Sequence, residues 1–170
     1  MNLFMFLTSL VLYTSIYSLS FTDTDGSTVN MSSFQNKKIL IVNIATNSPR
    51  VGQLTGLQQL KQQYGDSLVI IAFPSNSFGN ETRSDAEIKQ YCQQNYNVNF
   101  FIASKNSVFG LYIQPVYNWL KHTEENGVMD VEIMSDFQKI LINNDGNIIG
   151  VFAPGVSPTD TSIVSAITIN

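Results

Sequence analysis

The chain has 170 residues, of which 44% are hydrophobic and 11% aromatic, which is enough apolar surface to fill the core of one ordinary domain. Nine lysines and arginines stand against thirteen aspartates and glutamates, so the formal net charge is -4. The sequence contains no basic run and no alternation of aromatic and basic residues, and it therefore argues against nucleic acid as a partner.

The first eighteen residues, "MNLFMFLTSLVLYTSIYS", carry no charged side chain and are mostly apolar. This composition predicts a secretory signal peptide over residues 1–18, followed by a single domain over residues 19–170. The usual basic start is missing, and the apolar stretch is shorter than the roughly 20 residues that span a bilayer. An uncleaved anchor and a buried first strand stay open as alternatives. We expect a secreted or periplasmic protein with no stable membrane insertion after cleavage.

The residues that follow predict a β-hairpin and then a buried strand. Asp25-Gly26 lies between two alternating segments and favours a tight turn with positive φ angles. Residues 37–46, "KKILIVNIAT", form a continuous apolar run rich in β-branched side chains. Such a run is typical of a strand covered on both faces, so we expect it at the centre of the sheet.

Two helices and two further strands are expected next. Leucines at positions 54, 57 and 60, with Tyr64, predict one face of a helix that ends near Gly65. A buried strand over 67–74 follows. Ser84 and Glu87 form a capping box, and the helix that they begin directs Ile88, Tyr91, Cys92 and Tyr96 inward. Residues 98–103, "VNFFIA", predict another strand.

The last part of the chain predicts a helix over 114–123, an acidic loop over 124–132, and two strands joined by a turn at 144–147. Ser157-Pro158, together with Asp160, is expected to begin the final helix, with a proline in its first position. The order of elements predicts an α/β fold: a mixed central β-sheet flanked by helices, with an N-terminal β-hairpin.

Taken in order, these segments resemble the glutathione peroxidases, which have a thioredoxin-like fold. The resemblance covers residues 15–168 and is carried by "DTDG", "VNMSSF", "ILIVNIAT", "LTGLQQLKQQYGD", "VIIAFPSNSFGNE", "EIKQYC", "QPVYNWLK" and "NDGNIIGVFAP". It implies a peroxidase whose cysteine or selenocysteine, on the loop between a strand and a helix, attacks the peroxide O–O bond. Glutathione or thioredoxin would then reduce the oxidised residue, and neither a cofactor nor a metal is implied.

The chain departs from the family pattern where the chemistry takes place. The family motif VNxASxCG reads "VNIATNSP", which places Ser48 at the peroxidatic position. FPCNQFG reads "FPSNSFG", so Ser77 replaces the usual glutamine and Ser75 a frequent cysteine. The WNF motif reads "SDF", so Ser135 and Asp136 replace the tryptophan and asparagine. All four positions of the catalytic tetrad are therefore predicted to be substituted.

These substitutions remove what a peroxidatic thiol needs. A thiol can be ionised near neutral pH and can pass through a sulfenic acid, whereas the alcohol of Ser48 can do neither. Serines at two partner positions are short, and the carboxylate of Asp136 disfavours a second anion beside it. We therefore expect peroxidase activity that is absent or severely reduced.

Two residues have alternative interpretations. Ser48 precedes Pro49 and is interpreted mainly as the N-cap of the next helix rather than as a reactive group. A serine hydrolase is disfavoured, because the only histidine, His122, lies near a helix end. Cys92, the only cysteine, falls at the family's resolving position, but on the apolar stripe of a helix. It is interpreted mainly as a buried hydrophobe, and redox sensing stays open.

Three functions are therefore considered. The first is a non-catalytic role in a family that responds to peroxide. The second is weak peroxide reduction or redox sensing through Cys92. The third is a binding module that uses the emptied, serine-lined cleft. The expected partners are a peroxide or a thiol reductant. The resemblance also implies a monomer, because family members with a long insertion at the place of residues 124–132 tend to form tetramers and this segment is short.

Overall fold

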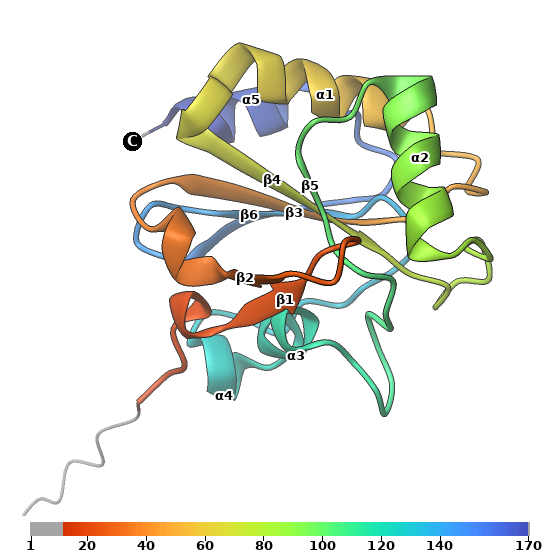
Figure 1. Cartoon of the computed structure of the whole chain (residues 1–170). Coiled ribbons are helices and arrows are strands. Elements are labelled where there is room, and N and C mark those ends of the chain that lie inside the picture. The colour runs from red at the N-terminus through yellow and green to blue at the C-terminus, as the bar shows by residue number, and fades with distance from the viewer. Residues whose placement is uncertain (1–11, 170) are drawn as a thin grey trace, which may run out of the picture.

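A five-stranded mixed sheet lies at the centre of the computed structural model, which describes residues 12–169 (Figure 1). The strand order is β5-β4-β3-β6-β7, with β3, β4 and β5 parallel and with β6 and β7 each antiparallel to the preceding strand in this order. The strands are β3 Lys38–Ile44, β4 Leu68–Pro74, β5 Phe101–Ile102, β6 Lys139–Ile142 and β7 Ile148–Phe152. The predicted mixed sheet is confirmed, and the apolar run of residues 37–46 forms its central strand, β3.

Two layers cover the sheet (Figure 1). One consists of α1 (Gln53–Tyr64), α2 (Asp85–Tyr96) and α5 (Thr161–Thr168). The other contains the hairpin of β1 and β2, together with α3 and α4. The bounds in this second layer are Ser20–Thr22 for β1, Thr28–Asn30 for β2, Pro115–Lys121 for α3 and Thr123–Asn126 for α4; short 3-10 helices span Ile16–Ser18, Met31–Phe34 and Gly65–Ser67.

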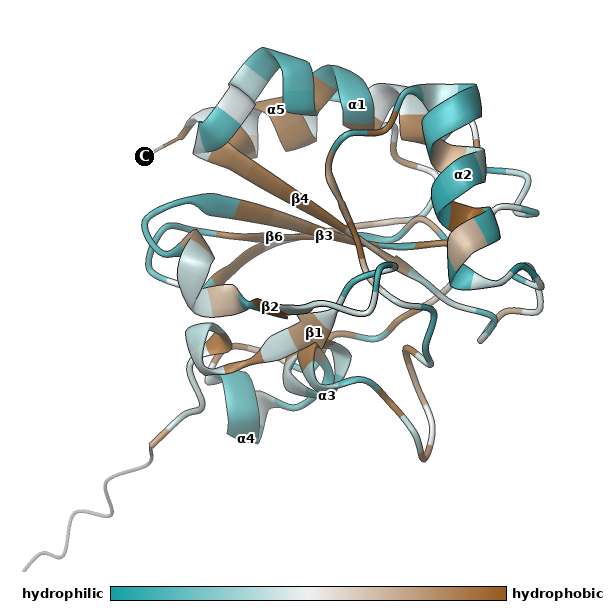
Figure 2. Cartoon of the chain, viewed as in Figure 1, coloured by the Kyte–Doolittle hydropathy of each residue, from teal (hydrophilic) through white to brown (hydrophobic). Residues whose placement is uncertain are grey.

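Successive side chains of β3 enter the two layers in turn. Ile39 and Ile41 pack on the side of α3, whereas Leu40 and Val42 pack against α1 and α5, and all four are fully buried. Figure 2 shows the apolar residues concentrated on the sheet and on the inward surfaces of the helices. Burying one such side chain contributes about 1.5–3 kcal/mol, so this strand anchors the fold.

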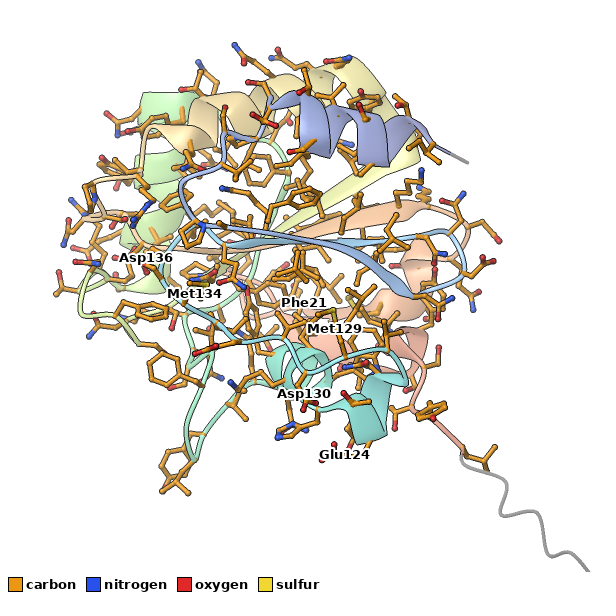
Figure 3. The ribbon with its side chains drawn as sticks, turned by 180° about the vertical axis from the view of Figure 1, so that it is seen from behind. Phe21, Glu124, Met129, Asp130, Met134 and Asp136 are labelled. Carbon is orange, nitrogen blue, oxygen red and sulfur yellow. The ribbon has the colours of Figure 1, made fainter. Side chains whose placement is uncertain are left out.

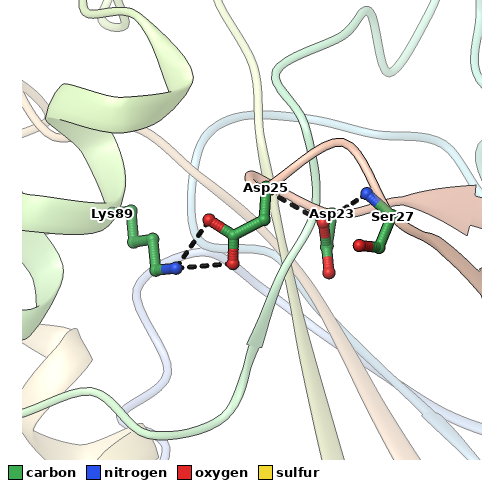
Figure 4. Close-up of polar contacts among 4 residues, drawn as sticks. All are labelled: Asp23, Asp25, Ser27 and Lys89. Atoms are coloured by element: carbon green, nitrogen blue, oxygen red, sulfur yellow. Dashed lines mark hydrogen bonds and ion pairs between the residues drawn. The ribbon is translucent and has the colours of Figure 1, made fainter.

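The two hairpin turns have the same geometry. In the first, Asp23 Oδ1 accepts hydrogen bonds from the backbone N–H groups of Asp25 and Ser27, both at 2.9 Å, and Gly26 has φ +83° (Figure 4). In the second, Asn143 takes the place of the aspartate, and its Oδ1 accepts hydrogen bonds from the backbone N–H groups of Asp145 and Asn147. Both predicted hairpins are confirmed, although only the glycine of each turn has a positive φ.

An ion pair joins the first hairpin to α2. Lys89 Nζ lies 2.7 and 2.6 Å from the two carboxylate oxygens of Asp25 (Figure 4). Helix α2 begins with the predicted capping box of Ser84 and Glu87, and α1 ends at Gly65 as expected.

Three local predictions were wrong. The strand expected over 98–103 is only Phe101–Ile102, at the edge of the sheet. The acidic loop begins with the helical turn α4, because the buried Asn126 binds the carbonyls of Trp119 and Met129. Helix α5 begins at Thr161 with Asp160 as its cap, one turn later than expected, since Pro158 packs instead against Gly56 of α1.

The segment just before the first strand is part of the domain. Ile16 is fully buried in the core, and the Trp119 indole N–H donates to the carbonyl of Thr14 at 2.6 Å. The Thr14 N–H donates to Glu125 O at 2.8 Å, and the Tyr17 hydroxyl donates to Asn144 O at 2.9 Å. The packed fold thus includes residues from Thr14 onward, and the first eleven residues of the signal peptide predicted over 1–18 lie outside the described residues. Within 12–169 there is no helix of the length and apolarity needed to cross a membrane.

Candidate functional site

The loop between β3 and α1 is held by a buried carboxylate. Glu81, which is fully buried, accepts hydrogen bonds from Thr46 N at 2.6 Å and from Thr46 Oγ1 at 2.8 Å. It also accepts from Arg83 N at 3.2 Å. Charge-assisted hydrogen bonds of this kind are stronger than neutral ones, so they fix the backbone two residues before Ser48.

Arg83 ties the same loop to α2. Its guanidinium donates to Thr46 Oγ1 at 2.5 Å and to Asn47 Oδ1 at 2.6 Å, and it lies 4.6 Å from the centre of the Tyr91 ring. The cation thus contacts the loop on one side and the aromatic face on the other. Glu81 and Arg83 therefore hold the strand side of the loop, at Thr46 and Asn47.

Ser48 is buried, with 2% of its surface exposed. Its Oγ accepts from Arg50 N at 3.3 Å, and its carbonyl accepts from Val51 N at 3.1 Å. The prediction that Ser48 caps the following helix was wrong, because α1 begins only at Gln53. The hydroxyl instead stabilises a turn that precedes the helix.

Asp136 lies beside Ser48 and is fully buried. Its Oδ2 accepts from Asn80 Nδ2 at 2.6 Å, whereas its Oδ1 has no hydrogen-bond partner among the described residues. Burial raises the pKa of Asp136, and the Asn80 amide, the Ser48 hydroxyl and the charge of Arg50 oppose that rise only in part. The site thus contains a carboxyl group that is poorly compensated as an anion.

Ser135 joins this group through its neighbours. Its Oγ accepts from Arg50 Nη1 at 3.3 Å, and its carbonyl accepts from Asn43 Nδ2 at 2.9 Å. The backbone N–H of Phe137 donates a hydrogen bond to Asn43 O at 2.7 Å, and Phe137 has a positive φ of +66°. The structure therefore brings together three of the four predicted positions: Ser48, Ser135 and Asp136.

Ser77 belongs to a separate group. Its Oγ accepts from Ser75 Oγ at 2.9 Å and from Val108 N at 3.2 Å. It also lines a polar cavity of about 350 Å³ with Asn76, Lys105, Asn106 and Ser107. The predicted serine-lined cleft is therefore not open at Ser48 and Asp136, which are buried. An accessible polar space lies beside Ser77.

Cys92 is fully buried against α1 and the sheet, as the apolar stripe predicted. Burial raises the pKa of its thiol to about 12, and the Glu81 carboxylate adds to the rise. The reactive form is the thiolate, which is therefore scarce at neutral pH.

We expect native Cys92 to react with iodoacetamide at pH 8 at least about a hundredfold more slowly than in the urea-unfolded chain, because the folded thiol is both un-ionised and covered. Intact mass against time measures the rate. A Leu60→Ala variant, which opens a cavity in the same core cluster, should react faster than the wild type. Equal rates in the folded and unfolded chains would contradict this assignment.

A second prediction concerns the buried charge of Asp136. Because its folded-state pKa is raised, its contribution to stability is full below the unfolded-state pKa of about 4 and is lost as the pH rises through the folded-state value. The free energy of unfolding of Asp136→Asn, minus that of the wild type, should therefore increase by about 1–3 kcal/mol from pH 4 to pH 7. Urea unfolding at both pH values tests this. The matched Asp66→Asn change, at an exposed carboxylate, should show no such gain, and a gain confined to pH 4 would contradict the prediction.

Among residues 12–169, His122 makes no hydrogen bond to Ser48. The His122 Nδ1 atom lies 2.8 Å from Asn118 O, at the junction of α3 and α4, where the sequence predicted a helix-end role. No group of three or more His, Cys, Asp or Glu side chains in this part of the chain is placed to hold a metal ion.

Sequence reasoning missed three residues of the site: Arg50, Asn80 and Glu81. Each follows closely on a motif that was noticed, since Arg50 comes two residues after Ser48 and the other two end "FPSNSFGNE". Glu81 lies seven residues after the end of β4, in a loop, so no spacing within the strand could have drawn attention to it.

Comparison with known proteins agrees with this geometry. The family model for glutathione peroxidase matches residues 16–121. A glutathione peroxidase of Lactococcus lactis is 36% identical over 148 residues, covering 86% of this chain and 94% of its own length. A glutathione peroxidase-like peroxiredoxin of Schizosaccharomyces pombe is 38% identical over 135 residues, covering 78% and 85%.

Solved structures give the same result for the fold. The apo form of Trgpx superimposes with a TM-score of 0.68 at 28% identity, covering 92% of this chain and 97% of that one. A thiol:disulfide interchange protein of the thioredoxin family from Chlorobium tepidum, at 15% identity and a TM-score of 0.60, covers 94% and 99% and shares the thioredoxin-like fold. The chain belongs to the glutathione peroxidase family.

Proposed function

We propose that this chain is a member of the glutathione peroxidase family that has lost thiol-dependent turnover of hydrogen peroxide and organic hydroperoxides. It keeps the family fold and acts without catalysis. The observation that carries the proposal is the Ser48–Asp136 pair: a buried hydroxyl beside a buried carboxyl group, at the position where the family resemblance expects an ionised sulfur or selenium.

The remaining thiol supports the same conclusion. Cys92 has no exposed surface and a pKa of about 12, so it offers a peroxide neither access nor a thiolate. Weak peroxide reduction or redox sensing through Cys92 would require the domain to open locally first. The structure therefore favours the non-catalytic role over the enzymatic alternative.

The test is peroxide consumption by the purified protein with glutathione, and separately with thioredoxin and its reductase, as reductant. We expect rates at the level of the buffer, unchanged in Cys92→Ser, while the Lactococcus lactis relative serves as the active control. Turnover comparable to that of the relative would refute the proposal. Turnover that disappears in Cys92→Ser would instead assign the activity to Cys92.

A second candidate is a binding role at the cavity beside Ser77. This space of about 350 Å³ is lined by the cation of Lys105 and by four amide and hydroxyl side chains. Such a lining suits a small polar anion. Lys105 is already oriented, because its Nζ donates to Arg83 O at 2.5 Å.

Calorimetric titration with glutathione, which carries two carboxylates, tests the binding role. Binding should weaken in Lys105→Met and stay unchanged in Lys61→Met, a lysine of α1 paired with exposed Asp66. Absence of heat in the wild type, or equal loss in both variants, would contradict it.

We also propose that the protein is exported as a monomer. The charge-free apolar start supports export, and the short segment over 124–132 supports the monomer. Recovery of the protein outside the cytoplasm tests export. The molar mass of the recovered protein in solution, measured by light scattering, tests the monomer. Recovery only in the cytoplasm, or the mass of a dimer, would contradict one or the other.

A further inference from the structure

The sulfur atoms of the described residues differ sharply in exposure. Cys92 and Met31 are fully buried, whereas Met129 is 42% and Met134 is 65% exposed. Figure 3 places Met134 next to Asp136 and Met129 farther along the same segment, near Asp130. Among the sulfur-containing residues that the structure describes, the most exposed is therefore Met134, a thioether two residues from the buried carboxylate of the site.

The backbone around Met134 is fixed, which keeps its side chain at the surface. Met134 N donates to Gln138 Oε1 at 2.8 Å, and Gln138 Nε2 donates to Glu132 O at 2.7 Å, so one buried amide holds both sides of the residue. Ile133, just before it, points into the core and is 6% exposed. Because its neighbours are anchored inward, Met134 cannot turn into the core without breaking these contacts.

We propose that Met134 is a site of oxidation by hydroperoxides, with Met129 as a slower second site. A lone pair of the thioether sulfur attacks one peroxide oxygen, the O–O bond breaks, and an S–O bond forms. The other oxygen leaves as water, or as an alcohol from an organic hydroperoxide, and carries the proton. Sulfur loses two electrons and the peroxide gains them, so methionine sulfoxide is the product.

The reaction needs no ionised sulfur, which separates it from thiol chemistry. A thioether has no proton to lose, so its rate is insensitive to pH, whereas a thiolate pathway speeds up as the pH approaches the thiol pKa. The sulfoxide is polar, and at an exposed position it can be hydrated. The modification is therefore compatible with the intact fold, unlike oxidation of Met31, which would place a polar oxygen in the core.

Oxidation of Met134 does not depend on whether the protein turns over peroxide catalytically. A chain that consumed peroxide catalytically would still carry an exposed thioether at Met134, and a chain that did not would show only a stoichiometric gain of oxygen. Peroxide consumption tests the loss of peroxidase turnover, and the mass of the protein tests the oxidation of Met134, so the two can fail independently.

The test is incubation of the full chain with hydrogen peroxide at pH 5 and pH 8, followed by peptide mass mapping against time. Met134 should gain 16 Da within about threefold of the rate of free methionine, Met129 several-fold more slowly, and Met31 at least about a hundredfold more slowly. The rates should agree at the two pH values, and the melting temperature of the oxidised protein should stay within about 2 °C of the untreated one.

Two variants sharpen the assignment. Met134→Leu should abolish the gain at position 134 and leave the Met129 gain unchanged, while Met129→Leu should abolish the gain at position 129 and leave the Met134 gain unchanged. Oxidation of Met134 no faster than that of Met31, a strong rise in its rate with pH, or loss of the fold after a single oxidation would each overturn the proposal.

Discussion

Ser48→Cys alone is expected to restore little peroxide turnover, whereas Ser48→Cys with Asp136→Asn is expected to turn over peroxide about 10- to 1000-fold faster than the single variant. In the single variant the new thiol and the Asp136 carboxyl group compete to be the one anion of a buried site, because a second negative charge beside the first is unfavourable. The carboxyl group is the stronger acid, so the thiol keeps its proton. Replacing the carboxylate by an amide removes that competitor and supplies an N–H donor to the thiolate.

The size of the difference between the two variants follows from the thiol pKa. A neighbouring like charge shifts a pKa by about 1–3 units, so the double variant should react about 10- to 1000-fold faster than the single one near neutral pH. Thiolate absorbance against pH gives the thiol pKa, and peroxide consumption with thioredoxin gives the rate. Ser48→Cys with Asp66→Asn is the matched control, because Asp66 is exposed. Equal rates in the double variant and in Ser48→Cys would show that Asp136 does not suppress the chemistry.

Both variants should remain below a fully equipped member of the family. Ser77 is bound to Ser75 and Val108, in a group separate from Ser48, and the Ser135 hydroxyl is engaged with Arg50. Among the described residues, neither hydroxyl forms a hydrogen bond with Ser48. Each missing donor to a developing anion costs roughly 100- to 1000-fold in such sites.

The fold could be predicted largely because its signals are local and repeated. The apolar run at β3, the leucines of α1 and the capping box of Ser84 and Glu87 each specify one element by spacing and side-chain type. The two glycine turns did the same for both hairpins. Where these local preferences agree with the tertiary packing, the sequence alone is a sufficient guide.

The mistakes arose where a distant contact decided the outcome. Pro158 has the features of a first helical residue, but its ring packs on Gly56, about a hundred residues earlier in the chain. Lys139, on which no prediction was made, lies in an apolar strand, and its Nζ donates to the carbonyls of Pro154 and Val156, 15 and 17 residues later in the chain. Arg50 and Asn80 likewise acquire their roles only when Asp136 is brought to them from the far end of the chain. Spacing within one element cannot reveal such partners.

Removal of residues up to Ser18, at the predicted cleavage point, is expected to destabilise the domain severely. A variant beginning at Leu19 loses the fully buried Ile16, and it leaves the buried Trp119 indole without the carbonyl of Thr14. Deleting one buried aliphatic side chain costs about 2–5 kcal/mol, and an unpaired buried donor about 1–3 kcal/mol. The sum is comparable with the whole stability of an ordinary domain, roughly 5–15 kcal/mol. Such a variant should be largely unfolded or should melt more than about 10 °C below the full chain.

A variant beginning at Leu12 is the matched control, because it keeps Ile16 and the carbonyl of Thr14 that accepts from Trp119, and it should melt well above the variant that begins at Leu19. Within that variant, Ile16→Ala should lower stability by about 2–4 kcal/mol, and Leu12→Ala should leave it unchanged. Thermal melting and urea unfolding measure both. If the protein is exported and cleaved, the mass of the mature form should then place the cut before Thr14, since a cut after Ser18 would release a chain unable to hold its fold. A stable domain beginning at Leu19 would show that the packing of Ile16 and Trp119 is dispensable, and would return the boundary to residue 18.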